Sequence, residues 1–73
     1  MNDYHINIFY SQEDRAYVAD IPDLVACSAL GDTPEEALRQ VQIAKAAWLD
    51  AARDEEKPIP VPRYRPLIYQ AVL

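Results

Sequence analysis

The sequence predicts an α+β domain in which a three-stranded antiparallel sheet carries one long helix, with a short strand at the C-terminus. Residues 3–10 and 16–21 are rich in β-branched and aromatic residues and are separated by a short polar turn. An uninterrupted run of good helix formers then occupies residues 34–54. The chain's single glycine, Gly31, stands just before that run. Together these observations predict the order β-β-β-α-β.

The three strands are predicted from alternation and from one proline. Residues 4–10 alternate between a Tyr/Ile face and a His/Asn/Phe face, which is the period of a strand. The turn before Ala16 is short enough for an antiparallel hairpin. Pro22 ends the second strand, because proline has no N–H to donate to a neighbouring strand. An apolar run then predicts a third strand over residues 25–30.

The helix has a clear start signal. Thr33 suits the N-cap, Pro34 suits the first helical position, and Glu36 can close a capping box on Thr33. We expect Lys45, which lies within the apolar stripe, to pack its stem and extend its amine outward. At helical spacing the stripe predicted to face the sheet contains Ala37, Leu38, Val41, Ala44, Trp48, Leu49 and Ala52.

The C-terminal part is predicted to be extended. Alternating prolines in residues 57–66 favour a stiff strap that carries the chain back along the sheet. Residues 67–72 predict either a short fourth strand or an arm that pairs with a second subunit. A chain of 73 residues with one cysteine has a small core and no disulfide, so oligomerisation is expected to add stability. The expected self-contact residues are Ile43, Ala47, Tyr64, Leu67, Ile68 and Tyr69.

Charge and composition narrow the possible partners. The formal net charge is −5, which argues against direct binding of nucleic acid, because phosphate contacts need Lys and Arg. An acidic surface suits a basic protein partner, although it also serves solubility. We expect a cytoplasmic protein that does not enter the membrane, since the sequence shows neither a signal peptide nor a long apolar run. The lone cysteine fits a reducing compartment.

The sequence offers little support for catalysis. Cys27 lies in an apolar run, and His5, the only possible base, lies on another predicted strand. A single glycine is too few for a phosphate-binding loop. Clustered carboxylates could hold Mg²⁺ for phosphodiester hydrolysis, but turn and helix-cap positions also explain them. These carboxylates are Asp20, Asp23, Asp32 and Glu36. We therefore expect no catalytic residue, metal or cofactor.

Two segments carry a resemblance to a known family. Residues 20–23 read Asp-Ile-Pro-Asp after the second predicted strand, and residues 31–37 read Gly-Asp-Thr-Pro-Glu-Glu-Ala at the helix start. With the proline-rich exit, this order resembles the HicB family of antitoxins over nearly the whole chain. The resemblance implies a partly degraded ribonuclease-H-like fold and assembly into dimers or tetramers. It also implies binding of HicA, a small basic toxin that cleaves mRNA.

The chain departs from the family pattern at two points. Residues 24–26 read Leu-Val-Ala where the family usually has a glycine turn, so we expect a corner built without a glycine at positive φ. Many family members continue into a helix-turn-helix or ribbon-helix-helix domain, and no such part follows here. Operator binding is therefore not expected.

The leading functional prediction is a non-catalytic antitoxin that binds and occludes a HicA-like toxin. Two alternatives stay open, namely an orphan oligomeric module that binds other proteins and a residual metal-dependent nuclease. From charge and position, the residues expected to contact the toxin are Tyr10, Glu13, Asp14, Asp20, Asp23, Asp54, Glu55 and Glu56.

Overall fold

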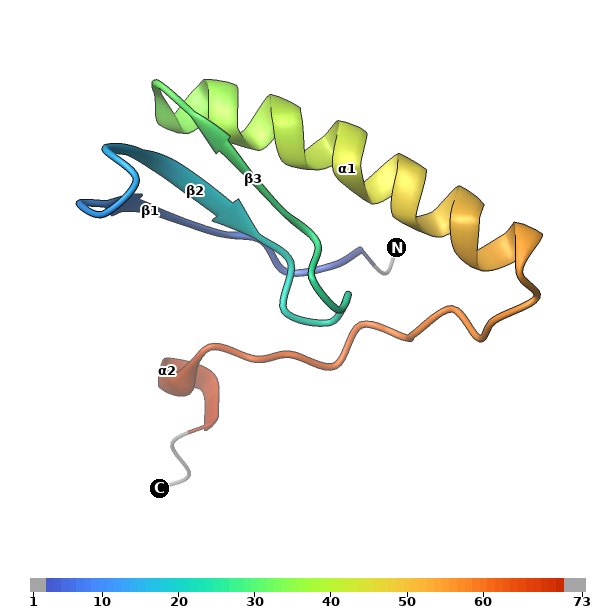
Figure 1. The fold of residues 1–73 in the computed structure, drawn as a ribbon. Helices are drawn as coiled ribbons and strands as arrows, with labels where there is room; N and C mark the ends of the chain where they lie inside the picture. Colours follow the sequence, from blue (N-terminus) through green and yellow to red (C-terminus); the bar gives the residue numbers. More distant parts are fainter. Residues whose placement is uncertain (1–2, 71–73) are drawn as a thin grey trace.

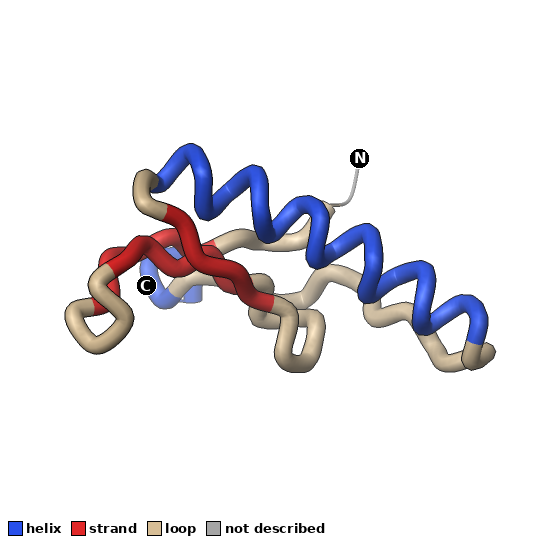
Figure 2. The backbone as a smooth tube through the Cα atoms, turned by 45° about the horizontal axis from the view of Figure 1, so that its top comes forward, coloured by secondary structure: helices blue, strands red, loops and turns tan. Residues whose placement is uncertain are grey.

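A computed structural model describes residues 3–70 and places a three-stranded antiparallel sheet against one long helix (Figure 1). The sheet has the order β1-β2-β3, and α1 lies along one of its faces (Figure 2). The predicted α+β class is therefore confirmed. The elements are β1 (Asn7–Ser11), β2 (Ala16–Asp20), β3 (Ser28–Gly31), α1 (Pro34–Asp54) and α2 (Leu67–Gln70).

The strand register decides which side chains share a face. Phe9 lies opposite Val18, and Val18 lies opposite Leu30, so the three form one row across the sheet. Ala19 and Ala29 form part of the next row, which points to the other face because successive side chains alternate. Ala19 is fully buried and Ala29 packs against the core. The face that carries Ala19 therefore meets α1, and the face that carries Phe9 is open.

The loop at residues 21–27 belongs to the core. It folds back on itself, with the Ile21 N–H donating to the Cys27 carbonyl at 3.0 Å and the Cys27 N–H donating to the Leu24 carbonyl at 3.2 Å. The side chains of these three residues are at most 3% exposed and cluster with Val41 of α1. The strand predicted over residues 25–30 is therefore wrong at 25–27, where the chain turns so that Cys27 can enter the core.

Two other predicted strands also need correction. The first, predicted over residues 3–10, begins only at Asn7, because β2 ends at Asp20, the residue opposite Asn7. The strand predicted over residues 67–72 is wrong at 67–70, where α2 forms. Pro66 opens this turn by accepting a hydrogen bond from the Tyr69 N–H, and no strand lies near enough in the described chain to pair with it. Residues 71 and 72 lie outside the described residues.

The predicted helix is confirmed at both ends. At the start, Thr33 Oγ1 accepts the Glu36 N–H at 3.0 Å, which satisfies one of the helix's unpaired donors. At the end, Glu56 takes a φ of 56° and the Lys57 N–H donates to the Ala52 carbonyl at 2.8 Å. This is a Schellman closure, in which a left-handed residue turns the chain away from the helix.

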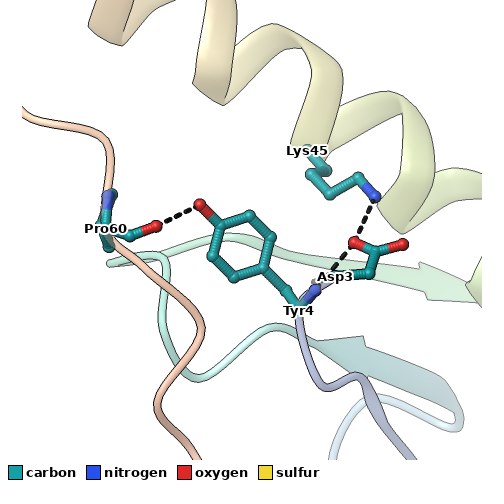
Figure 3. A network of polar contacts seen from close by, with 4 residues as sticks. All are labelled: Asp3, Tyr4, Lys45 and Pro60. Atoms are coloured by element: carbon teal, nitrogen blue, oxygen red, sulfur yellow. Dashed lines mark hydrogen bonds and ion pairs between the residues drawn. The ribbon is translucent and has the colours of Figure 1, made fainter. Parts of the chain in front are cut away.

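The N-terminal segment is held between α1 and the strap at residues 57–66 (Figure 3). Asp3 accepts hydrogen bonds from its neighbour's backbone N–H and from Lys45 Nζ, the latter at 3.2 Å. Both donors lower the pKa of Asp3, the Tyr4 N–H most of all. The Tyr4 hydroxyl donates to the Pro60 carbonyl. The Lys45 amine thus extends out of the apolar stripe to an ion pair.

The strap is also anchored to the loop at residues 21–27. The Asp23 carboxylate accepts the backbone N–H of Arg63 and that of Tyr64, both at 3.1 Å. The Tyr64 ring stacks on His5, with ring centroids 4.7 Å apart. The strap therefore runs beside the sheet as predicted, and its fixed points are one carboxylate and one aromatic stack.

The glycine-free corner between β2 and β3 nevertheless contains a left-handed residue, since Ala26 has a φ of 59°. We expect Ala26→Gly to raise the free energy of unfolding by about 0.5–1 kcal/mol in urea denaturation. Left-handed backbone costs a residue with a Cβ about 1–2 kcal/mol, part of which the greater freedom of unfolded glycine offsets.

Val25→Gly is the matched control, because Val25 is the chain neighbour of Ala26, is 81% exposed and has negative φ. It should lower stability slightly, through the freedom that glycine gives the unfolded chain. Equal changes in the two variants would contradict a specific strain at Ala26.

Candidate functional site

An exposed apolar row crosses the open face of the sheet. Phe9 is 51% exposed and Leu30 is 50% exposed, with the partly buried Val18 between them. Within the described residues, neither α1 nor α2 packs over this row. Contiguous apolar side chains of this kind are typical of surfaces that bind other molecules.

One end of the sheet is acidic. The turn between β1 and β2 and the connection from β3 to α1 lie at this end, because Tyr10, Tyr17 and Gly31 are opposite one another across the three strands (Figure 1). The apolar row lies one residue further along each strand. We call this region the acidic end, and its carboxylates are Glu13, Asp14, Asp32, Glu35 and Glu36.

The side chains that could take part in catalysis or metal binding either lie far apart or already form hydrogen bonds within the fold. His5 Nε2 hydrogen-bonds to Asn7 Oδ1 at 2.6 Å, and the Asp23 carboxylate holds the strap. Asp20 ends β2 at the opposite end of the sheet from Asp32. Among residues 3–70 no group of three or more His, Cys, Asp or Glu side chains is placed to hold a metal ion.

A shallow hollow of about 300 Å³ lies between the C-terminal half of α1 and the loop at residues 21–27. Trp48 closes part of it by donating its indole N–H to the Val25 carbonyl at 2.9 Å. The polar groups that line the hollow are the side-chain ends of Glu55 and Lys57, which form an ion pair with each other at 2.9 Å. The hollow thus presents an apolar wall, and the two charged side chains at its rim are paired with each other.

Burial raises the pKa of the Cys27 thiol above its ordinary value of 9.0, and the negative charge of Asp20 raises it further. The folded state therefore holds the thiol proton more tightly than the unfolded state. This contribution to stability is complete below the unfolded pKa and is lost as pH rises through the folded pKa. We expect the melting temperature to fall less steeply above pH 9 in Cys27→Ala than in the natural protein.

A thiol reagent gives an independent measurement. At pH 8, Cys27 should label slowly in the folded protein and rapidly in denaturant, because a buried protonated thiol is a poor nucleophile. Rapid labelling of the folded protein would contradict the buried placement of Cys27.

Comparison with known proteins identifies a family for this chain. Residues 4–68 match the family model described as HicB_like antitoxin of bacterial toxin-antitoxin system. The chain belongs to the HicB-like antitoxin family. It is also 36% identical over 53 residues to UPF0150 protein ssl0259 of Synechocystis sp., a match that covers 73% of each chain. No solved structure matches it.

Three of the toxin-contact residues predicted for this HicB-like chain lie together. Tyr10, Glu13 and Asp14 are at the acidic end, where the Tyr10 ring packs edge-on against Tyr17 with centroids 5.2 Å apart. Sequence reasoning missed Phe9 and Leu30. The signal that could have pointed to Phe9 was that β1 carries aromatic residues on both of its faces.

The other predicted toxin-contact residues of the HicB-like chain lie elsewhere. Asp20 is on the open face but at its far end, in line with Asn7 and Ser28. Asp23 lies beneath the strap. Residues 54–56 form the C-terminal end of α1, remote from the acidic end (Figure 1). The structure therefore does not bring the eight residues into one site.

The predicted self-contact residues of the HicB-like chain are also dispersed. Ile43, which is 60% exposed, and Ala47 lie on the outer side of α1. Tyr64 is partly buried by His5, and the last three are exposed on α2, which lies apart from the sheet and α1. These three are Leu67, Ile68 and Tyr69.

Within residues 3–70, no helix has the length and apolar character needed to cross a bilayer.

Proposed function

We propose that this protein is the antitoxin of a toxin–antitoxin pair, and that it binds a small basic HicA-like toxin and covers the surface with which the toxin cleaves mRNA. The observation that carries the proposal is the apolar row of Phe9, Val18 and Leu30 beside the acidic end. Membership of the HicB-like antitoxin family supports the role. The protein acts by binding, in the cytoplasm where mRNA is found, and performs no chemistry of its own.

The two parts of this surface have different tasks in the proposal. The carboxylates of the acidic end attract the positive groups with which a nuclease holds RNA phosphates, so they speed encounter and take the place of RNA. The apolar row is desolvated in the complex and sets the rate of dissociation. Tyr10 is exposed at the edge of β1 beside the acidic end, and its side chain lies on the opposite face of the sheet from the apolar row.

Co-expression with a HicA-like toxin tests the proposal. The natural chain should restore growth and co-purify with the toxin. Leu30→Lys should weaken the complex by about tenfold or more, because it places a positive charge where the proposal requires apolar contact with a basic protein. Glu13→Gln combined with Asp32→Asn should mainly slow association and flatten its salt dependence.

Ile43→Lys is the matched control, since Ile43 is exposed to a similar extent but lies on α1. It should leave toxin binding unchanged. Growth inhibition that persists, with no complex recovered, would contradict the proposal and favour the orphan binding module instead. Equal effects of Leu30→Lys and Ile43→Lys would show that the open face is not the toxin site.

A further inference from the structure

The strap at residues 57–66 is held to the rest of the domain by side chains. Within the described chain, the backbone of residues 58–65 forms no hydrogen bond with the backbone of the sheet, of α1 or of the loop at residues 21–27. Three of the strap residues, Pro58, Pro60 and Pro62, have no N–H to donate. The strap therefore lacks the network of backbone hydrogen bonds that joins the three strands to one another.

Three contacts fix the strap. The Tyr4 hydroxyl donates to a strap carbonyl (Figure 3), and the Tyr64 ring stacks on His5. The third contact is the Asp23 carboxylate, which accepts the backbone N–H of Arg63 and that of Tyr64, both at 3.1 Å. Hydrogen bonds to a charged acceptor are roughly twice as strong as those between neutral groups, so Asp23 contributes most to holding the strap.

The core of the domain is built without the strap. The buried residues of the core cluster, and the half-buried residues packed against them, all lie between Tyr4 and Trp48. From Ile59 to Pro66 the strap residues alternate between exposed and half-buried, and none of them is buried. A segment that buries little apolar surface opens at a small cost in free energy, whereas core elements open only when the whole domain unfolds.

A hollow of about 340 Å³ lies between the strap and the start of the loop at residues 21–27. Protein cores are close-packed, so a hollow of this size shows that the strap rests on the loop without the packing of a core. The residues that line the hollow are Pro22, Asp23, Ile59, Pro60, Val61 and Arg63.

We propose that the strap and α2 detach from the domain together while the sheet and α1 stay folded, and that the Asp23 carboxylate controls this opening. The prolines stiffen the strap, so that it moves as one piece. Within the described residues, α2 contacts neither the sheet nor α1 and therefore moves with the strap. The opening is independent of toxin binding, because none of the three contacts involves the apolar row or the acidic end.

Limited proteolysis with trypsin tests the opening at the strap itself. Trypsin cleaves after Lys and Arg but not before proline, and Lys57 and Arg65 are each followed by proline. The bond between Arg63 and Tyr64 is therefore the one tryptic site in the strap. The N–H of this bond is one of the two that Asp23 holds, so cleavage requires that the strap leave the loop.

The fragment that ends at Arg63 should accumulate during digestion, because cleavage of a segment tracks how often that segment opens. The fragment should keep the circular dichroism of a folded sheet and helix, since the core lies outside the strap. Cleavage after Arg63 and within α1, after Arg39 and Lys45, at one common rate would mean that the strap opens only when the whole domain unfolds. That result would overturn the proposal.

Asp23→Asn should speed cleavage after Arg63 by about tenfold or more, because the amide replaces a charged acceptor with a neutral one of the same shape. Tyr4→Phe should speed it less, since it removes a hydrogen bond between neutral groups. Asp32→Asn is the matched control, because it makes the same chemical change at an exposed residue of the acidic end, and it should leave the rate unchanged. Equal cleavage rates in Asp23→Asn and Asp32→Asn would overturn the role of Asp23.

Hydrogen exchange of the natural chain gives a measurement that needs no variant. The N–H groups of Arg63 and Tyr64 are hydrogen-bonded to Asp23, so they exchange with water only when the strap opens. After correction for intrinsic rates, they should exchange about a hundredfold or more faster than the amides of Val41 and Ala44 in α1. Equal protection of the strap amides and the α1 amides would overturn the proposal.

Discussion

Replacing Gly31 with alanine is expected to lower the free energy of unfolding by about 3 kcal/mol, the upper end of the cost of overpacking. A Cβ on Gly31 would lie 2.3 Å from the backbone N of Ala37 and 2.8 Å from the carbonyl carbon of Glu36. Both are backbone atoms in the first turns of α1, so no side-chain rotation can relieve the contact. The helix would have to move away from β3, and the packing between them would be lost.

The requirement for glycine here comes from close approach and not from backbone conformation, because the φ of Gly31 is not positive. A domain of this size is stable by roughly 4–11 kcal/mol, so the expected loss removes a large share of the total. Urea denaturation followed by circular dichroism measures it. Ser28→Ala, at an exposed position in the same strand, should change stability by less than about 0.5 kcal/mol. An unchanged midpoint for Gly31→Ala would contradict the close packing of β3 against α1.

The parts of the fold that depend on local signals could be predicted from the sequence. The helix follows from Thr33, Pro34 and a run without glycine or proline, all of which act within a few residues of one another. The pairing of β1 with β2 follows from alternation and a short turn. Such features require no knowledge of distant contacts, and the structure reproduces them within one residue for α1 and β2.

The parts that depend on distant contacts could not be predicted. Residues 24–30 form one apolar run, and only packing against Val41 decides that its first half turns inward as a loop. At residues 67–70, an apolar sequence alone suits a strand as well as a helix, and the lack of a neighbouring strand in the described chain decides in favour of α2.

The candidate site was difficult to predict for a related reason. Tyr10, Glu13 and Asp14 were predicted from charge and position and lie together at the acidic end, whereas Phe9 and Leu30 were not predicted. Ile8 and Phe9 are both large and apolar, so alternation could not show which face of β1 meets α1. That choice depends on how α1 crosses the sheet, and α1 is fixed over β3 by the close contact at Gly31.

Leu24→Ala is expected to cost about 3 kcal/mol, although Leu24 lies in a loop between two strands. Leu24 is 2% exposed and belongs to the core cluster that joins Ile21 to Val41 of α1, so its truncation leaves a cavity that rigid neighbours cannot fill. Its backbone hydrogen bonds to Ile21 and Cys27 are unaffected by the substitution, so the loss reports on side-chain packing alone. Thermal and urea unfolding measure it, with Val25→Ala as the control at the 81% exposed neighbour. If Leu24→Ala lowers the free energy of unfolding strongly and Val25→Ala hardly changes it, the loop at residues 21–27 and α1 unfold together. Equal small losses in the two variants would mean that the loop covers the core without contributing to its stability.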